Sequence, residues 1–309
     1  MYRGYKEHTG SLSWSVESMC KVMSTQYGTS LSPSGYYDFK KRPPSKRSIQ
    51  DEILKVAIVE LYEKNYSCYG VQKMYKELRR KGHRVARCTT ERLMKDLDIR
   101  GRGRHKPKRT TTAGKGARRS EDLVERNFYA DMPNQLWVAD FTYVNTWEGY
   151  CYVAFIVDVY ARRIVGHAVS TRMNKDMVAR AFSVALWNRT KQNLGDFENL
   201  IHHTDQGSQY TSDDFVELLA RHGIKTSIGS VGCSYDNALA ETINGAYKNE
   251  LINFFGPWKS FEELNLETEI WVKWYNEERI NEYCDWQTPS EVEQLWYATG
   301  EDFRKEAKS

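Results

Sequence analysis

Residues 135–144 read Gln-Leu-Trp-Val-Ala-Asp-Phe-Thr-Tyr-Val, a run of β-branched and aromatic side chains with one acid in its middle. Such residues favour a strand because they pack well on a pleated surface. Residues 150–160 and 162–170 are similarly rich in these types, and Glu148-Gly149 supplies a turn before them. Three strands joined by tight turns are therefore predicted, with Asp140 on the first.

The chain then alternates between helical and strand patterns. Apolar residues recur at the helical period over 175–190, and a second helical stretch, 212–222, ends at Gly223. Residues 199–204 and 225–229 are predicted strands. Three strands followed by alternating helices and strands predict an α/β fold in which helices cover a sheet.

Two further acidic residues lie at positions where the local sequence is expected to expose the carboxylate: the end of a strand and the start of a helix. Asp205 follows Asn-Leu-Ile-His-His-Thr (199–204), where an apolar strand runs into a polar turn. Glu241 lies near the start of a helix in Ser-Tyr-Asp-Asn-Ala-Leu-Ala-Glu (234–241). Three carboxylates brought together would hold two Mg²⁺ ions, with Mn²⁺ as a substitute, because hard cations take oxygen ligands and bridge phosphate oxygens. Asp140, Asp205 and Glu241 are therefore predicted to be both catalytic residues and metal ligands in the cutting and joining of nucleic-acid backbones.

The helix of Glu241 can be divided into two faces at about 100° per residue. Asn237, Asn244 and Lys248 fall on the side of Glu241, and the opposite side holds Leu239, Ile243, Ala246 and Tyr247. The apolar face is predicted to pack on the sheet, so that Glu241, Asn244 and Lys248 are presented together. Glu250 falls on the apolar side, where we expect a buried partner rather than a metal ion.

Charge is distributed unevenly along the chain. Residues 1–119 contain 28 Lys and Arg against 11 Asp and Glu, whereas residues 120–309 contain 17 against 30. The first part is a candidate polyanion-binding region. Residues 100–119 hold nine Lys and Arg and no acid, which indicates either a linker that follows phosphates or a merely solubilising one. The DNA contacts predicted there are Arg102, Arg104, Lys106, Lys108 and Arg109.

Three helical patterns precede this linker. In 49–64 the apolar residues have helical spacing: Ile49, Ile53, Val56, Ala57 and Val59, with Leu61 beyond them. The second pattern ends at Gly82, and Thr89 or Thr90 is predicted to cap the third. Basic side chains on the outer faces indicate a helix-turn-helix module, with a plain helical bundle bearing a solvated charged face as the alternative.

Several other titratable residues have structural interpretations. Asp158 lies beside Arg162 and Arg163 and is predicted to form a structural ion pair. His202 and His203 are predicted to shape the metal site from a strand end rather than to bind zinc. The six cysteines are widely spread and include no Cys-x-x-Cys pair, as is typical of reduced thiols in an intracellular protein.

Four motifs follow one another in the chain. They are Trp-Val-Ala-Asp-Phe-Thr-Tyr (137–143), His-Thr-Asp-Gln-Gly-Ser-Gln-Tyr (203–210), Tyr-Asp-Asn-Ala-Leu-Ala-Glu-Thr (235–242), and Trp-Tyr-Asn-Glu-Glu-Arg (274–279) followed by Thr-Pro-Ser (288–290). In this order and spacing, with Lys248 after the third, they resemble the catalytic core of bacterial insertion-sequence transposases of the second-reading-frame (OrfB) type, relatives of retroviral integrase. The resemblance covers nearly the whole chain.

The resemblance implies a fold and an activity. The fold would be ribonuclease H-like, a mixed five-stranded sheet with flanking helices, preceded by an all-α helix-turn-helix region, and the strands of Asp140 and Asp205 would be neighbours. The activity would be that of a DDE transposase, a polynucleotidyl transferase that cleaves DNA strands and joins 3′-OH ends to a target by two-metal phosphoryl transfer. Lys248 would hold a phosphate near the cut, and we expect Asn244 and Asn237 to contact DNA beside it.

The domain organisation predicted on these grounds has five parts. They are a basic N-terminal helical segment (1–48), a helix-turn-helix-like DNA-binding domain (49–99), a basic linker (100–131), the catalytic core (132–256) and an aromatic-rich helical extension of the core (257–309).

The resemblance also implies partners. These are double-stranded DNA, as the terminal inverted repeats of the element and as target DNA, and at least one further copy of the chain, since two element ends must be brought together. The family often joins a first-frame product to the second-frame part; because the residues show no heptad run, we expect this chain to be the second-frame product. No apolar run is long enough for a membrane span, so we expect a bacterial cytoplasmic protein that associates with the nucleoid when bound to DNA.

Two other classes of protein share some of these features. A ribonuclease H-like nuclease or junction resolvase would use the same acids but only cleave. A catalytically silent DNA-binding regulator would bind DNA and carry out no metal-dependent chemistry.

Overall fold

The computed structural model describes residues 14–103, 122–124, 127–192, 194, 197–205, 209–210, 212–229 and 237–304. Its internal contacts divide the chain into two compact units, Met1–Leu54 and Lys55–Ser309. The first unit holds α2 (Val16–Tyr27), α3 (Pro33–Lys41) and the beginning of α4 (Lys46–Lys64). Within the described ranges, no helix is long and apolar enough to cross a membrane.

The second unit begins with the rest of α4, followed by α5 (Val71–Arg80) and α6 (Arg87–Asp96). The apolar stripe predicted in α4 was only partly right: Ile49, Ile53 and Val56 are exposed, whereas Leu61 is buried, together with Leu54 and Ile58. Both stripes have helical spacing, so only packing against neighbouring helices selects one of them. The predicted cap of α6 was also wrong, because the helix begins after Ala86 and Thr90 lies inside it, donating its hydroxyl to the Ala86 carbonyl at 3.2 Å.

The rest of the second unit is built on a five-stranded sheet in the order β3-β2-β1-β4-β5. β1, β2 and β3 are antiparallel neighbours, and β4 and β5 continue the sheet parallel to β1. The mixed sheet and the adjacency of the strands that lead to Asp140 and Asp205 are therefore confirmed. The strands are β1 (Leu136–Thr146), β2 (Gly149–Asp158), β3 (Arg163–Ser170), β4 (Ile201–Thr204) and β5 (Lys225–Ile228).

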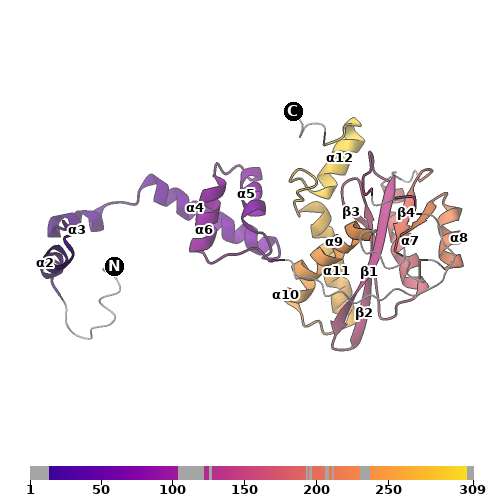
Figure 1. Ribbon diagram of the computed structural model, residues 1–309, viewed down its shortest axis with the longest axis horizontal. Coiled ribbons are helices and arrows are strands. Elements are labelled where there is room, and N and C mark those ends of the chain that lie inside the picture. Colours follow the sequence, from indigo (N-terminus) through magenta and orange to yellow (C-terminus); the bar gives the residue numbers. More distant parts are fainter. Residues whose placement is uncertain are drawn as a thin grey trace. The chain divides into compact units, whose positions relative to one another are not determined.

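Helices cover both faces of this sheet (Figure 1). One face carries α7 (Lys175–Lys191) and α8 (Asp213–Arg221). The other carries α9 (Ala238–Tyr247) and α11 (Phe261–Glu277). Between α9 and α11 lie a π-helical turn, η2 (Lys248–Ile252), and the short α10 (Asn253–Phe255), and α12 (Pro289–Thr299) follows.

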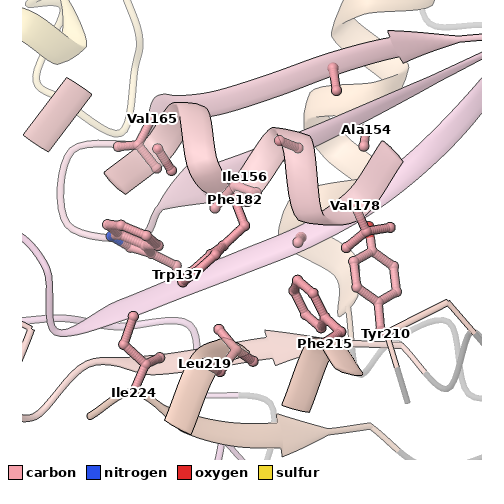
Figure 2. Packing of buried hydrophobic residues seen from close by; sticks show 14 of the residues in the cluster. Trp137, Ala154, Ile156, Val165, Val178, Phe182, Tyr210, Phe215, Leu219 and Ile224 are labelled. Carbon is pink, nitrogen blue, oxygen red and sulfur yellow. The ribbon is translucent and has the colours of Figure 1, made fainter. Parts of the chain in front are cut away.

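The core on the first face is a cluster of buried aliphatic and aromatic side chains from the sheet, α7 and α8 (Figure 2). Phe182 of α7 lies between Trp137 of β1 and Phe215 of α8, with ring centroids 6.4 and 5.9 Å away. All three side chains are buried. This packing fixes β1, and with it the position of Asp140, against two helices.

Contacts within the second unit also join α4 and the following loop to the C-terminal helices. The Asn65 side-chain oxygen accepts a hydrogen bond from the indole of Trp274 at 3.3 Å. The Tyr69 hydroxyl accepts one from the backbone amide of Ile280 at 3.0 Å. The aromatic-rich C-terminal segment therefore has buried contacts in this unit, including Trp271 and Tyr275.

Gly166 of β3 allows α7 to approach the sheet closely. A Cβ at this position would lie 2.3 Å from the Ala181 carbonyl oxygen and 2.8 Å from the Ala185 Cβ. We expect Gly166→Ala to lower the free energy of unfolding by about 1–3 kcal/mol through overpacking, measured as a lower thermal midpoint. Gly245→Ala is the matched control, because a Cβ there meets no atom within 4 Å; equal effects of the two substitutions would contradict the prediction.

Candidate active site

The parallel pairing of β1 and β4 places two of the predicted acids side by side. Ala139 is the register partner of Thr204, so Asp140 and Asp205 are the next residues on neighbouring parallel strands. Glu241 lies in the first turn of α9, which packs on β1. The three acids thus come from the central strand, the end of its neighbour and one helix.

Asp140 is the most buried of the three acids. Its Oδ1 accepts a hydrogen bond from the Phe141 amide at 2.8 Å, and its Oδ2 accepts one from Asn244 Nδ2 at 2.9 Å. Burial raises the pKa of Asp140 to about 8, and the charges of Asp205 and Glu241 act in the same direction. Burial and Asp205 also raise the pKa of Glu241. The three acids therefore form one electrostatic cluster.

The donor set of this cluster suits a divalent cation. Carboxylate oxygens are the ligands that Mg²⁺ and Mn²⁺ prefer, and a bound cation would offset both the burial and the repulsion that raise these pKa values. Among the described residues, no group of three His, Cys, Asp or Glu side chains is arranged to hold an ion. The segments next to Asp205 and before Glu241, residues 206–208 and 230–236, lie outside the described residues.

Two asparagines hold α9 against β1. Asn237 is 3% exposed and donates from Nδ2 to the Ala139 carbonyl at 3.0 Å, one residue before Asp140. Asn244 donates to Asp140 itself, two turns further along the helix. These two bonds fix Glu241 relative to Asp140, and contact of either asparagine with DNA stays a prediction.

Lys248 and Glu250 lie where α9 passes into the π-helical turn η2. The Lys248 Nζ is 4.5 Å from the centroid of the Tyr143 ring. Burial lowers the pKa of Lys248, while the charge of Asp140 acts in the opposite direction. Glu250 has the buried partner expected of it: Arg279 of the fourth motif binds both carboxylate oxygens at 2.7–3.0 Å.

Only one of the five predicted linker contacts lies in the described part of the chain. Arg102 donates to the Glu250 carbonyl at 2.8 Å, and its guanidinium lies 3.3 Å from the centroid of the Phe254 ring. It therefore attaches the start of the linker to η2 and α10, and its contact with DNA stays a prediction. Arg104, Lys106, Lys108 and Arg109 lie outside the described residues.

The other titratable residues singled out from the sequence have structural partners. His203 and His202 are buried, and His203 Nδ1 lies 2.8 Å from the Ser227 hydroxyl. Asp158 forms the predicted ion pair, but its partner is Arg189 at 2.8 Å rather than its sequence neighbours. The side chains that meet in a buried pair are set by tertiary packing, which sequence proximity does not reveal.

Two tyrosines beside the acids received no role from the sequence. The Tyr210 ring stacks on Phe141 at 6.3 Å and is 1% exposed. Burial, followed by the charges of Asp140 and Asp205, raises its pKa well above the ordinary value. Tyr143 lies under the Lys248 ammonium and is 57% exposed. Both tyrosines belong to the motifs quoted above, and this membership was the signal in the sequence that could have identified them as site residues.

Family models match most of the second unit and the end of the first. Two models described as integrase core domains match residues 130–234 and 222–289, and an HTH-like domain model matches residues 48–107. The catalytic core of HTLV-2 integrase, solved in complex with magnesium, is 18% identical over 52% of this chain and 97% of its own length, with a TM-score of 0.40.

Curated relatives match over most of their length. A Mycobacterium tuberculosis protein assigned as a transposase for insertion sequence element IS986/IS6110 is 50% identical over 87% of this chain and 96% of its own. The transposase for insertion sequence element IS629 of Shigella sonnei is 44% identical, covering 87% and 90%. Transposase InsF for insertion sequence IS3A of Escherichia coli K12 is 31% identical, covering 78% and 80%.

The ribonuclease H-like sheet and the integrase core domain define a polynucleotidyl transferase. The chain belongs to the insertion-sequence transposases with an integrase core and an HTH-like domain, of the second-reading-frame type. It is a DNA transposase.

Proposed function

We propose that Asp140, Asp205 and Glu241 hold two Mg²⁺ ions, with Mn²⁺ as a substitute, and that this site cleaves and joins DNA strands at the ends of an insertion sequence. The observation that carries the proposal is the electrostatic coupling of Asp140 on β1 with Asp205, directly after β4, and Glu241 on α9; burial and these two acids raise the pKa of Asp140 to about 8. Bound divalent cations would lower the pKa of the attacking hydroxyl and stabilise charge on the leaving oxygen.

The chain's own side chains would position the reacting groups. Asn244 orients Oδ2 of Asp140, so that the free lone pairs of this carboxylate point away from the amide. Asn237 ties the start of α9 to the strand of Asp140. Lys248, close enough to Asp140 for their charges to interact, would bind a phosphate next to the scissile bond. Water would attack first, and the freed 3′-OH would then attack the target strand.

The proposed DNA partners are the terminal inverted repeats of the element and a target duplex. Residues 49–99 would act as the DNA-binding domain, and the basic stretch that begins near Arg102 would follow the backbone phosphates. At least two copies of the chain would assemble on DNA, because two element ends must be joined to one target. A first-frame protein, separate or fused, would add to this assembly.

Removal of metal tests the proposal most directly. A duplex with a pre-cut 3′ end from the terminus of the element that encodes the chain is incubated with a target duplex, in Mg²⁺ and in EDTA. We expect joined products in Mg²⁺ and none in EDTA, with Mn²⁺ restoring joining.

The same assay separates the alternatives. Cleavage of an uncut terminus without joining would contradict the transposase reaction and indicate a nuclease. DNA binding with neither reaction would indicate a regulator, or a requirement for the first-frame part, which is then added to the assay.

A further inference from the structure

The hairpin that carries Asp140 projects beyond β4, its neighbour on one side in the sheet. β4 pairs with β1 only from Leu136 to Ala139, whereas β2 pairs with β1 as far as Thr146. From Asp140 onward, the edge of β1 that faces β4 therefore has no β4 partner. Asp140 and Asp205 lie where the pairing of β1 with β4 ends, and the part of the hairpin beyond β4 begins at Asp140.

The two faces of the projecting hairpin differ. One face is covered: Val144 and Cys151 are each 2% exposed, and the Trp147 amide donates to the Trp258 carbonyl at 3.0 Å. The other face presents Tyr143 and Tyr150, which are 57% and 60% exposed and whose rings meet edge to face at 6.1 Å. Two aromatic side chains near the carboxylates are thus more than half exposed.

A cation lies over the ring nearer to the carboxylates. The Lys248 Nζ is 4.5 Å from the Tyr143 ring centroid, which is a cation–π distance, and it also interacts with the charge of Asp140. Tyr143 lies three residues beyond Asp140, or about 10 Å along the strand, so the two side chains leave opposite faces of β1, and Lys248 is the residue that interacts with both. This distance corresponds to about three base-pair rises of DNA. A phosphate held by Lys248 would therefore bring a base within reach of the Tyr143 ring.

We propose that Tyr143, with Lys248, forms a subsite that stacks on an unpaired base within a few nucleotides of the reacting phosphate; this proposal rests on the proposed function and specifies its substrate. The base must be unpaired because, within a duplex, neighbouring bases cover both of its faces. Aromatic stacking accepts any base, since every base has a π-face. The element end would thus be opened locally at the site, with Lys248 on the phosphate and Tyr143 on the base.

This subsite is tested by combining substitutions in the protein with changes in the DNA and comparing their separate and joint effects on strand transfer. Strand transfer is measured for wild type and for Tyr143→Ala, Tyr143→Leu and Tyr143→Phe, on DNA with an abasic site moved through about three nucleotides on each side of the joined phosphate. We expect about tenfold loss for the Ala and Leu variants, equivalent to about 1.4 kcal/mol, and at most about twofold for Phe, which keeps the ring. At one position, the abasic site should reduce strand transfer by wild type about tenfold and should not reduce strand transfer by Tyr143→Ala any further.

Trp147→Ala is the matched control, because Trp147 is a 70% exposed aromatic residue at the tip of the same hairpin. It should stay within about twofold of wild type. If the loss of strand transfer from Tyr143→Ala multiplied with the loss from the abasic site at every position, the ring would only position Lys248. If Tyr143→Phe lost as much strand transfer as Tyr143→Ala, the effect would belong to the hydroxyl. Either result overturns the base subsite. Absence of joining by wild type would instead count against the proposed function.

Discussion

Glu241→Gln is expected to reduce strand transfer by about 1000-fold or more, and Asp140→Asn and Asp205→Asn should do the same. Each substitution keeps the shape of the side chain but removes one anionic oxygen from the proposed metal ligands. Because the ligands act as one unit, each single loss should approach the effect of losing all three. The measurement is the rate of joining of a pre-cut end in Mg²⁺.

Two controls separate lost chemistry from lost folding. Glu217→Gln removes an exposed acid of α8, which pairs with Arg221 on the same helix face, and should leave joining within about twofold of wild type. Asp140→Asn should be at least as thermally stable as wild type in EDTA, because it removes a charge that burial and two neighbouring acids disfavour. Any of the three variants that joins DNA within about tenfold of wild type would remove that residue from the proposed catalytic set.

Arg189→Met is expected to destabilise the second unit by about 3–5 kcal/mol. The Arg189 guanidinium is 1% exposed and binds Asp158 at 2.8 Å and both oxygens of Glu293 at 2.7 and 2.8 Å. Arg163 completes the cluster at 2.6 Å from Glu293. Without Arg189, Asp158 would remain as a buried charge with no cation against it, in a position that ties β2, α7 and α12 together.

The pKa of Glu293 indicates the same dependence, whereas burial raises the pKa of Asp158 although Arg189 acts against it. Burial by itself would raise the pKa of Glu293, yet Arg189 and Arg163 hold it below the ordinary value. A lowered pKa in the folded state means that the pair stabilises the fold above the ordinary glutamate pKa and loses this contribution as the pH falls. Arg189→Met should remove this part of the acid sensitivity together with the stability.

The measurement is the midpoint of thermal unfolding, which should fall by roughly 10 °C in Arg189→Met. Arg221→Met is the matched control, since its exposed pair with Glu217 should contribute less than about 0.5 kcal/mol. Combining Arg189→Met with Asp158→Asn and Glu293→Gln should recover part of the loss, because no buried charge is left unpaired. Equal midpoints for Arg189→Met and Arg221→Met would contradict this account.

The element types could be predicted from local sequence. Strand and helix periods follow from backbone geometry, so runs such as 135–144 identify a strand wherever they occur. The division of the Glu241 helix into two faces likewise predicted that Asn244 lies on the same side as Glu241. In the structure Asn244 donates a hydrogen bond to Asp140. The adjacency of the strands of Asp140 and Asp205, which was expected only from family resemblance, is confirmed.

Partners that are distant in the sequence were decided only by the tertiary structure. Asp158 pairs with Arg189 and Glu250 with Arg279, although nearer cations were available to Asp158 in the sequence. The buried stripe of α4 was likewise selected by its neighbours rather than by its period. A periodic pattern determines which residues share a face, because that is a property of one backbone segment. What the face meets depends on packing between segments, and this packing placed Lys248 over Tyr143 and within range of the charge of Asp140.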